Sequence, residues 1–342
     1  MKKVLVGMSG GVDSSVAAKL LIDSGFSVTG VTLKLFDGES SCCSLSDIED
    51  ARSVCIKLGI EHLVFNFKDY FEEYVIDHFV DTYMNGGTPN PCIECNRKIK
   101  FEKMLERAEV LGFDYIATGH YAKIENGQLK RAVDTSKDQT YVLYMLTKNM
   151  LAKTLFPLGD YTKTQIRQIA EENDFINAKK KDSQDICFVP DGDYSEFIYS
   201  KTKTNFPQGS FLDLQGNILG KSENHIKYTI GQRKGLGIAI GKPAYVIAKN
   251  VENNTVTLGN DEDLFTCTLI ANDLNLLTYI SENTLITAKT RYSQKASEAI
   301  LKVNGDTATV KFLTPQRAIT KGQAVVFYDG NTVIGGGSIV ES

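Results

Sequence analysis

The amino-acid sequence of 342 residues predicts an α/β protein: a doubly wound parallel sheet, followed by a small linker domain and a C-terminal β-barrel. In the first part, short apolar runs alternate with helical stretches that end at glycine, which is typical of parallel strands joined by crossover helices. Beyond about residue 201, helical periodicity gives way to short alternating runs separated by Gly, Asn and Asp, which indicates all-β structure. We therefore expect three domains, over residues 1–202, 203–262 and 263–342.

The residues that start and stop helices define the elements of the first domain. Strands are expected at residues 4–6, 27–36, 62–67 and 114–119. Between them, Ser46 or Asp47 caps a helix, and a long amphipathic helix spans residues 69–83. A further helix is expected over residues 97–111, and Thr162 caps a later one. In an open parallel sheet, ligands bind at the carboxyl ends of the strands.

Residues 7–14, with the sequence GMSGGVDS, join the first strand to the first helix. Adjacent glycines allow a tight turn whose backbone N–H groups point at one place, and the positive end of the following helix faces the same place. The Ser9 and Ser14 hydroxyls add hydrogen-bond donors. No lysine follows the glycines, so this is not a kinase-type phosphate loop. The order SGGVDS resembles instead the pyrophosphate loop of enzymes that split ATP between its α and β phosphates.

Composition bounds the class of protein. Hydrophobic residues make up 42% of the chain and charged residues 23%, as in a globular protein, and no segment is apolar over a length that could span a membrane. Seven cysteines without an export signal favour reduced thiols and a cytoplasmic protein. The net charge of −4 argues against RNA binding, unless local basic patches such as residues 179–181 and 233–234 provide it.

Cys95 and Cys187 each lie beside basic residues, which lower the pKa of a thiol and make its thiolate available. Cys95 is also expected just before a helix, where the helix dipole favours the anion. The pair is equally consistent with two small buried residues. A thioredoxin-like C-x-x-C motif would follow the first strand of its fold, which this one does not. A zinc site would need a second pair of ligands. Both interpretations are therefore disfavoured. Cys42 and Cys43 are expected to be loop residues.

An adenylating loop combined with reactive cysteines implies that ATP activates an oxygen, which sulfur then displaces. With further short motifs, the chain closely resembles the bacterial tRNA-specific 2-thiouridylases over essentially its full length. The motifs that carry the resemblance are GMSGGVDS at 7–14, GGTPNPxxxCN at 86–96, ATGHY at 117–121, KDQ at 137–139, KKDSxxICF at 180–188, GQRKGLGIA at 231–239, RY at 291–292 and GQ at 322–323.

The resemblance implies a catalytic domain of the adenine nucleotide alpha hydrolase type, and 2-thiolation of the wobble uridine in the tRNAs for lysine, glutamate and glutamine. ATP, with Mg²⁺, would adenylate the oxygen on C2 of the uridine, and persulfide sulfur would displace AMP. The implied partners are the tRNA anticodon stem-loop and a cysteine desulfurase or sulfur-relay protein. Cys187 would carry the persulfide, and Cys95 would attack it and end in a disulfide with Cys187. The resemblance overrules the argument from net charge against RNA.

The same motifs assign the binding residues by resemblance. ATP would be held by the loop, by one residue of the second strand and by one at the end of the fourth: Gly7, Met8, Ser9, Gly10, Gly11, Val12, Asp13, Ser14, Leu33 and Gly119. tRNA would be contacted by residues from two motifs of the first domain and two motifs of the barrel: His120, Lys137, Asp138, Gln139, Arg291, Tyr292 and Gln323.

One position departs from the family pattern, because many members carry Asp where this chain has Cys92. Cys92, Cys95 and Cys187 would together offer three thiolates, enough for an iron–sulfur cluster, so a cluster is the alternative to the persulfide route that we expect. Two other classes of protein share parts of the pattern. An amidotransferase-linked synthetase would share the ATP loop without needing Cys95 or Cys187, and a non-catalytic RNA-binding protein would not need the loop.

Overall fold

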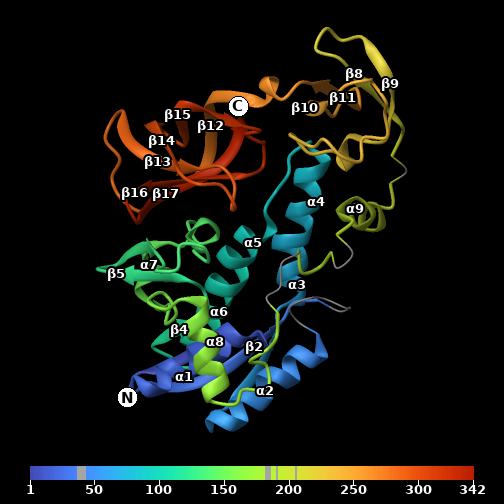
Figure 1. The fold of residues 1–342 in the computed structure, drawn as a ribbon. Coiled ribbons are helices and arrows are strands. Elements are labelled where there is room, and N and C mark those ends of the chain that lie inside the picture. Colours follow the sequence, from blue (N-terminus) through green and yellow to red (C-terminus); the bar gives the residue numbers. More distant parts are fainter. Residues whose placement is uncertain (37–43, 182–185, 190–191, 205) are drawn as a thin grey trace. The chain divides into compact units, whose positions relative to one another are not determined.

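The computed structural model describes residues 1–36, 44–181, 186–189, 192–204 and 206–342 (Figure 1). Contacts divide the chain into two compact units, each assembled from segments that are distant in the sequence. Unit 1 comprises residues 1–76, 91–192 and 329–334, and unit 2 comprises residues 77–90, 193–328 and 335–342. The domain boundaries at 202 and 262 stay a prediction.

Unit 1 is built on a five-stranded parallel sheet with the strand order β3-β2-β1-β4-β7. Its strands are β1 (Lys3–Gly7), β2 (Ser27–Lys34), β3 (His62–Asn66), β4 (Tyr115–Ala117) and β7 (Thr154–Leu155). Val4, Leu5 and Val6 have no exposed surface, as expected for a central strand covered on both faces. The predicted doubly wound parallel sheet is confirmed. Its strand order reverses between β1 and β4, which is where such sheets bind ligands.

Three helices of unit 1 are α1 (Val12–Asp23), α2 (Leu45–Leu58) and α8 (Lys163–Glu172). Ser44 caps α2 through a capping box with Asp47. We expected the cap at Ser46 or Asp47, but Asp47 is instead the third helical residue that completes the box. Thr162 caps α8, as predicted, and Gln165 completes a second capping box. Both caps satisfy N–H groups that have no partner within the helix.

Two helical segments contain π-helical turns. The first runs through α3 (Lys68–Phe71), η1 (Glu72–Ile76) and α4 (Asp77–Met84), and the second through α5 (Pro91–Glu94), η2 (Cys95–Lys103) and α6 (Met104–Val110). The helix expected over residues 69–83 exists, but it passes from unit 1 to unit 2 after Ile76. The second helix begins at Pro91 rather than at residue 97, because proline is well suited to the first helical position. π-Helical turns are rare and are frequent at functional sites.

The remaining elements of unit 1 are a β-hairpin, a 3-10 turn and a short helix. They are β5 (Ala122–Glu125), β6 (Gln128–Arg131), the 3-10 turn η3 (Thr140–Val142) and the short helix α7 (Lys148–Ala152). β5 and β6 form the hairpin, and β6 is antiparallel to the start of β17 (Thr332–Glu341), where Lys130 lies opposite Thr332. The first residues of β17 therefore belong to unit 1, although the rest of that strand belongs to unit 2.

Unit 2 contains a four-stranded sheet with the order β10-β11-β8-β9. The elements of this part are α9 (Tyr194–Thr202), β8 (Gly209–Leu212), β9 (Ile218–Ser222), η4 (His225–Lys227), β10 (Tyr245–Asn250), β11 (Thr255–Gly259) and η5 (Glu262–Leu264). Phe211, Val246 and Val256 are buried in its core. Tyr83 of α4 stacks on Tyr194 of α9, with ring centroids 4.8 Å apart, which ties α4 to this unit.

The chain ends in a closed β-barrel. Besides β17, its strands are β12 (Phe265–Leu276), β13 (Thr284–Lys289), β14 (Ser297–Asn304), β15 (Thr307–Arg317) and β16 (Ala324–Asp329). They pair in the order β12-β15-β14-β13-β16-β17, and β12 also pairs with β17, which closes the barrel. The predicted C-terminal barrel is confirmed. Across the described part of the chain, no helix is long and apolar enough to cross a membrane.

Candidate active site

The loop between β1 and α1 lies at the carboxyl end of the sheet, beside the end of β4. Gly10 has a left-handed conformation with φ of +73°, and a Cβ there would lie 2.3 Å from the Asp47 carbonyl oxygen. A Cβ on Gly119, which follows β4, would lie 2.7 Å from the Ser14 nitrogen. Both positions require glycine, since the loop is held closely between the first turn of α2 and the end of β4.

Hydrogen bonds fix the conformation of this loop. Ser14 Oγ donates to the Gly11 carbonyl at 3.1 Å, and the Ser9 N–H donates to Ser14 Oγ at 3.2 Å. Asn177 Nδ2 donates to the Gly10 carbonyl at 3.0 Å. Gly11 has no side chain that could cap α1, so the first N–H groups of this helix are directed at the loop. The arrangement is suited to bind a phosphate group.

Asp13, the charged residue of the loop, pairs with a lysine from a distant element. Lys163 Nζ, at the start of α8, lies 2.8 Å from each carboxylate oxygen of Asp13. The Tyr121 hydroxyl donates to Asp13 Oδ1 at 2.8 Å, and Lys163 Nζ lies 5.9 Å from the centroid of the Tyr121 ring. A positive charge therefore stands beside a loop that has no lysine of its own. Sequence reasoning missed Lys163, because it belongs to none of the motifs and is 150 residues from Asp13.

The start of α2, against which Gly10 packs, is anchored by Lys180. Lys180 Nζ lies 2.7 Å from Asp47 Oδ1 and 2.7 Å from Asp50 Oδ2. Burial alone would raise the pKa of Asp47, but hydrogen bonds from Lys180 and Ser44 outweigh it and lower this pKa. Burial opposes the charge of Lys180 as well, yet the two carboxylates raise its pKa. Lys180 is therefore engaged within the protein, although its sequence neighbourhood suggested a patch for RNA.

The two cysteines expected to be reactive lie in segments that contact the same helical element. Cys95 is 7% exposed and begins η2, whereas Cys187 is half-buried. The ring of Phe188, the residue after Cys187, lies 5.7 Å from that of Phe71 in α3, centroid to centroid. α3 and η1 also pack against η2. Both cysteine-bearing segments are thus brought to the α3–η1 element of unit 1.

The expectation that Cys95 lies just before a helix is wrong. The helix begins at Pro91, so Cys92 occupies its first turn and Cys95 lies within it. Cys92 is exposed and Cys95 is buried, so the two thiols face different surroundings. Among the described residues, which include Cys187, no group of three His, Cys, Asp or Glu side chains is placed to hold a metal ion. The structure therefore does not support an iron–sulfur cluster on Cys92, Cys95 and Cys187. Residues 42 and 43, the two loop cysteines, lie outside the described residues.

His120, which we expected to contact tRNA, is buried in unit 1. It is 8% exposed, shares a 2.8 Å hydrogen bond with Thr118 Oγ1, and lies against the rings of Phe101 and Phe156. Burial, with a smaller effect of the charge on Lys100, lowers the pKa of His120 to about 3. The imidazole is therefore neutral near pH 7, and its contact with tRNA stays a prediction.

The neighbouring motif KDQ also forms internal contacts. Asp138 is 8% exposed and accepts a hydrogen bond from Thr140 Oγ1 at 2.8 Å. Gln139 Oε1 accepts from the Tyr121 N–H at 2.9 Å, and the Gln139 N–H donates to the Tyr121 carbonyl at 2.9 Å. Because the Tyr121 hydroxyl donates to Asp13, this motif supports the loop of residues 7–14.

In unit 2, two of the expected tRNA-binding residues connect backbone segments. Arg291 Nη2 donates to the carbonyls of Ile230 and Ala318, at 3.2 and 2.8 Å. Gln323 Nε2 donates to the Thr88 carbonyl at 2.6 Å. These hydrogen bonds hold the barrel against the GQRKGLG segment and against the turn that follows α4.

The remaining expected residues divide between core and surface. Met8 and Leu33 are 2% and 9% exposed and belong to the core around the sheet. Lys137 is half-buried. Tyr292 is 44% exposed, and Lys289 Nζ lies 5.8 Å from the centroid of its ring. The structure thus gathers the loop residues with Gly119, and it leaves Tyr292 as the barrel residue of this set with the most accessible side chain.

Comparison with known proteins shows to which family this chain belongs. Residues 2–191 match the model of the tRNA methyl transferase HUP domain, residues 195–260 that of the tRNA methyl transferase PRC-barrel domain, and residues 266–339 that of the aminomethyltransferase beta-barrel domain. A tRNA-specific 2-thiouridylase MnmA from Clostridioides difficile is 51% identical, over 100% of this chain and 99% of that protein. The chain belongs to the tRNA-specific 2-thiouridylase family. Its relative from Acetivibrio thermocellus is 50% identical over 99% of both chains.

Among solved structures, this member of the family is similar to a 4-thiouridine synthetase in complex with RNA and ATP. The TM-score is 0.40 and the identity 20%, over 59% of this chain and 50% of that one. A likeness at this TM-score carries no functional argument. The family assignment rests on the full-length relatives and on the three matched regions.

Proposed function

We propose that this member of the 2-thiouridylase family converts a uridine of tRNA to 2-thiouridine and uses ATP to do so. The oxygen on C2 of the uridine attacks the α-phosphate of ATP, pyrophosphate leaves, and C2 then carries an adenylate. Sulfur adds to C2, and AMP leaves with the original oxygen. The observation that carries the proposal is the phosphate-binding loop with the Asp13–Lys163 pair beside it, in a chain whose relatives are named for tRNA thiolation.

The loop provides the parts that such an adenylation requires. Gly10 and Gly119 allow the backbone to approach a phosphate closely, and the N–H groups at the start of α1 face it. Lys163 stabilises the negative charge that develops on the leaving pyrophosphate. Asp13 offers the carboxylate oxygens that a Mg²⁺ ion accompanying ATP prefers, and such an ion neutralises phosphate charge.

Cys187 and Cys95 have different proposed roles in the transfer of sulfur. Cys187 carries the sulfur as a persulfide. The Cys95 thiolate attacks Cys187 Sγ, the persulfide S–S bond breaks, a Cys95–Cys187 disulfide forms, and hydrosulfide is released to C2. A thiol reductant then restores both cysteines. The half-exposed position of Cys187 supports this division, because the carrier must be reached by a donor, whereas Cys95 is buried.

The proposal also names the nucleotide that is modified, the tRNAs that carry it and the source of the sulfur. The target is the wobble uridine in the anticodon stem-loop of the tRNAs for lysine, glutamate and glutamine, and the sulfur comes from a cysteine desulfurase or relay protein of the cytoplasm. Resemblance to the family supports these assignments. Cys92 has no step in this route, so its thiol is dispensable.

The test is a reaction with purified protein, ATP, Mg²⁺, tRNA, cysteine and a cysteine desulfurase, followed by mass spectrometry of the tRNA nucleosides. We expect 2-thiouridine in the three tRNAs, with one AMP and one pyrophosphate for each. A matched tRNA with cytidine at the wobble position should stay unmodified. Pyrophosphate release without a thiolated nucleoside would contradict the proposal. A methylated nucleoside in a parallel reaction that also contains a methyl donor would favour the methyl transfer that the matched domain names describe.

A further inference from the structure

Unit 2 contains a strongly basic stretch within a chain of net charge −4. Between residues 221 and 249 there are six Lys or Arg residues and one acidic residue, Glu223. RNA affinity depends on such local cations, because each phosphate contact releases a counterion. Five residues that we expected to contact tRNA are instead engaged inside the protein: His120, Asp138, Gln139, Arg291 and Gln323. The basic stretch offers further cations for tRNA phosphates.

The GQRKGLG motif forms a loop whose conformation is fixed by Gln232. Gln232 Oε1 accepts from the Thr229 N–H at 3.0 Å, and Gln232 Nε2 donates to the Lys234 carbonyl at 3.0 Å. The Val246 N–H donates to the Gln232 carbonyl at 3.0 Å, which ties the loop to β10. The basic side chains of this loop are thus presented on a fixed backbone, which lowers the entropy cost of binding.

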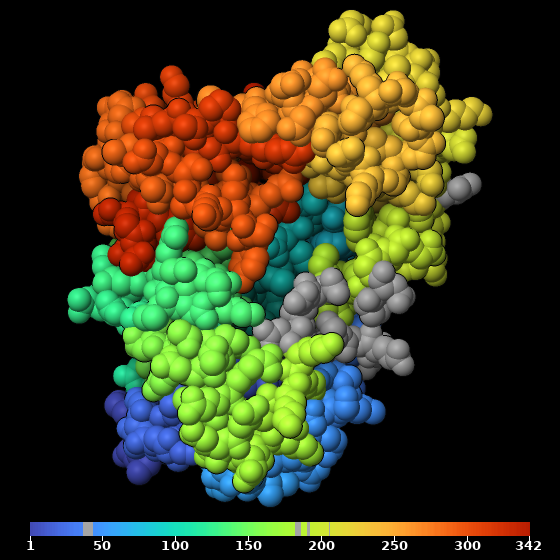
Figure 2. Space-filling view, in the orientation of Figure 1, coloured from blue at the N-terminus to red at the C-terminus, as the bar shows by residue number. Residues whose placement is uncertain are grey.

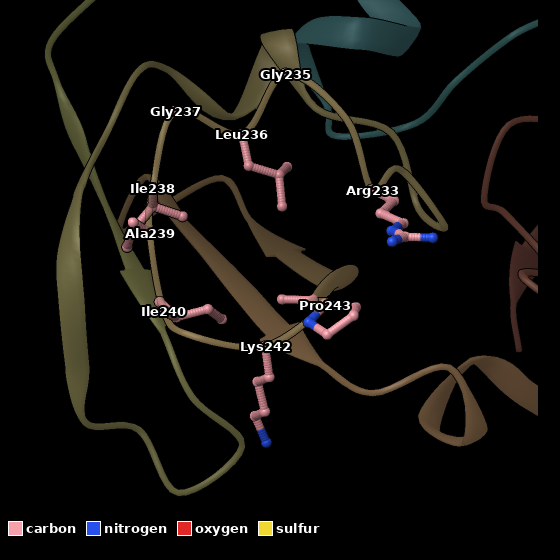
Figure 3. Close-up of a pocket in the computed structure, with 10 residues that line it drawn as sticks. Arg233, Gly235, Leu236, Gly237, Ile238, Ala239, Ile240, Lys242 and Pro243 are labelled. Atoms are coloured by element: carbon pink, nitrogen blue, oxygen red, sulfur yellow. The ribbon is translucent and has the colours of Figure 1, made fainter.

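The loop and the segment after it line an open pocket of about 470 Å³ (Figure 3). This volume lies in the range of small-molecule sites, about 300–1,000 Å³. Leu236, Ile238 and Ile240 give it apolar walls, and Leu236 belongs to the buried core of the four-stranded sheet. Arg233 and Lys242 lie at different edges of the pocket, and no lining residue is acidic. The pocket is therefore apolar inside and cationic at its margin.

The cations at this margin are not neutralised by acidic side chains. Within the part of the chain that the structure describes, no ion pair involves Arg233, Lys234 or Lys242. Lys242 Nζ donates to Asn260 Oδ1 at 3.2 Å, which is a neutral partner, and Arg233 and Lys234 are exposed. In Figure 2, yellow and light-orange atoms of this part of the chain lie at the surface. These charges are available to an anion from solution.

We propose that this pocket binds one nucleotide of the tRNA substrate. Its phosphates contact Arg233 and Lys242, and its base lies on the apolar wall formed by Leu236, Ile238 and Ile240. An apolar ligand without charge would leave the two cations unused, and an inorganic anion would leave the apolar wall uncovered, whereas a nucleotide matches both. The inference rests on the proposed function, because it names where the same substrate is held.

The test measures binding of full-length glutamate tRNA by fluorescence anisotropy at several salt concentrations. The double variant Arg233→Ala/Lys242→Ala should bind about tenfold or more weakly, because hydrogen bonds to charged groups are lost. The slope of log affinity against log salt should fall by about two. Ala239→Trp fills the pocket without a change of charge, so it should weaken binding and leave the slope unchanged. ATP affinity and the thermal midpoint should match wild type.

The matched control is Lys302→Ala/Lys311→Ala, which removes two exposed charges of the same unit on β14 and β15. An equal loss in the control, or wild-type affinity and slope in the pocket variant, would overturn the inference. Normal tRNA binding with a lost response to the desulfurase would assign the pocket to a protein partner instead. Wild-type protein that binds tRNA through this pocket without forming 2-thiouridine would contradict the proposed function and leave the pocket supported. Absence of tRNA binding would contradict both.

Discussion

Lys163 and Asp13 form an ion pair at the loop proposed to bind ATP, although 150 residues separate them in the sequence. The Lys163 side chain is 12% exposed, and its Nζ lies 2.8 Å from both carboxylate oxygens of Asp13. A kinase-type loop carries its lysine within the glycine-rich motif. Here the lysine comes from the first residue of α8, which the Thr162 capping box positions. The pairing holds the charge close to where phosphates are expected.

Replacing Lys163 by Met should weaken ATP binding about tenfold to a hundredfold, because a hydrogen bond from a charged group to phosphate is lost. AMP lacks the β and γ phosphates, so its affinity should change much less. Calorimetric titration with ATP, pyrophosphate and AMP measures both effects. Lys163→Arg should recover part of the affinity.

The control for this variant is Lys19→Met, which removes an ion pair of similar length with Asp23 on the exposed end of α1. It should leave every nucleotide affinity unchanged. If Lys163→Met weakened ATP and AMP equally and also lowered the thermal midpoint, Lys163 would act by supporting the loop and not by contacting the pyrophosphate portion.

Burial of His120 predicts that acid destabilises the protein. Its pKa is about 3 in the folded chain and 6.5 in the reference state. Between these values the unfolded chain binds a proton that the folded chain does not, so the free energy of unfolding falls as pH falls. The loss approaches about 1.4 kcal/mol per pH unit and is absent above pH 6.5.

Urea unfolding measured between pH 7.5 and pH 5 gives this slope. Below about pH 5 carboxylates also titrate and would contribute to the slope. His120→Gln should reduce the pH dependence whatever its effect on stability at pH 7.5. His78→Gln, at an exposed histidine, is the control and should keep the wild-type slope. An unchanged slope in His120→Gln would show that other groups cause the acid sensitivity.

Arg291 should contribute to stability more than to RNA affinity. Its replacement by Ala removes the hydrogen bonds from the guanidinium to the Ile230 and Ala318 carbonyls, and leaves the Ala318 carbonyl with the Thr320 hydroxyl as its donor. A lost hydrogen bond from a charged group costs about 1.5–3 kcal/mol. Lysine cannot reproduce the guanidinium geometry, so Arg291→Lys should restore little. Differential scanning calorimetry should show a lower midpoint for the transition of unit 2. Tyr292→Ala, at the exposed neighbour, should leave that midpoint unchanged. A stable Arg291→Ala variant with a reduced salt slope for tRNA would reverse this assignment.

The fold was predictable where a local pattern decides it. The apolar run at Val4–Val6 and the glycines after it define a buried strand and a tight turn, and alternation beyond residue 263 defines barrel strands. The membership of α4 in unit 2 was not predictable, because it depends on contacts such as Tyr83 with Tyr194, which are distant in sequence. The helix that contains Cys95 begins at Pro91 and not at the expected residue 97, because proline is suited to the first helical position.

The candidate site, like the fold, was predictable where a local sequence pattern decides it and not where distant contacts do. Residues 7–14 were identified from their own sequence, since the phosphate-binding geometry is local. Lys163 was missed because its role arises from tertiary contact with Asp13. His120 and Arg291 were expected at an RNA surface, whereas burial and backbone hydrogen bonds engage them within the protein. Motif residues can therefore also support the fold that carries a site.

The cysteine roles predict three distinct phenotypes. With cysteine and a desulfurase as the sulfur source, Cys187→Ser should carry no persulfide and form no 2-thiouridine. Cys95→Ser should carry the persulfide on Cys187 but release no sulfur, because the attacking thiolate is missing. Cys92→Ser should keep most of the activity, since no step uses that exposed thiol. Mass spectrometry of the protein and of the tRNA nucleosides separates these outcomes.

Cys267→Ser is the matched control, because Cys267 is half-buried like Cys187 but lies on β12 of the barrel. It should accept sulfur on Cys187 and thiolate tRNA as wild type does. Each serine variant should bind ATP normally, which separates a chemical defect from misfolding of the loop. A persulfide found on Cys95 in the wild type would exchange the two roles. An inactive Cys92→Ser variant that still loads Cys187 would place the third thiol in the release step, because loading would then be intact and only the transfer to C2 would fail.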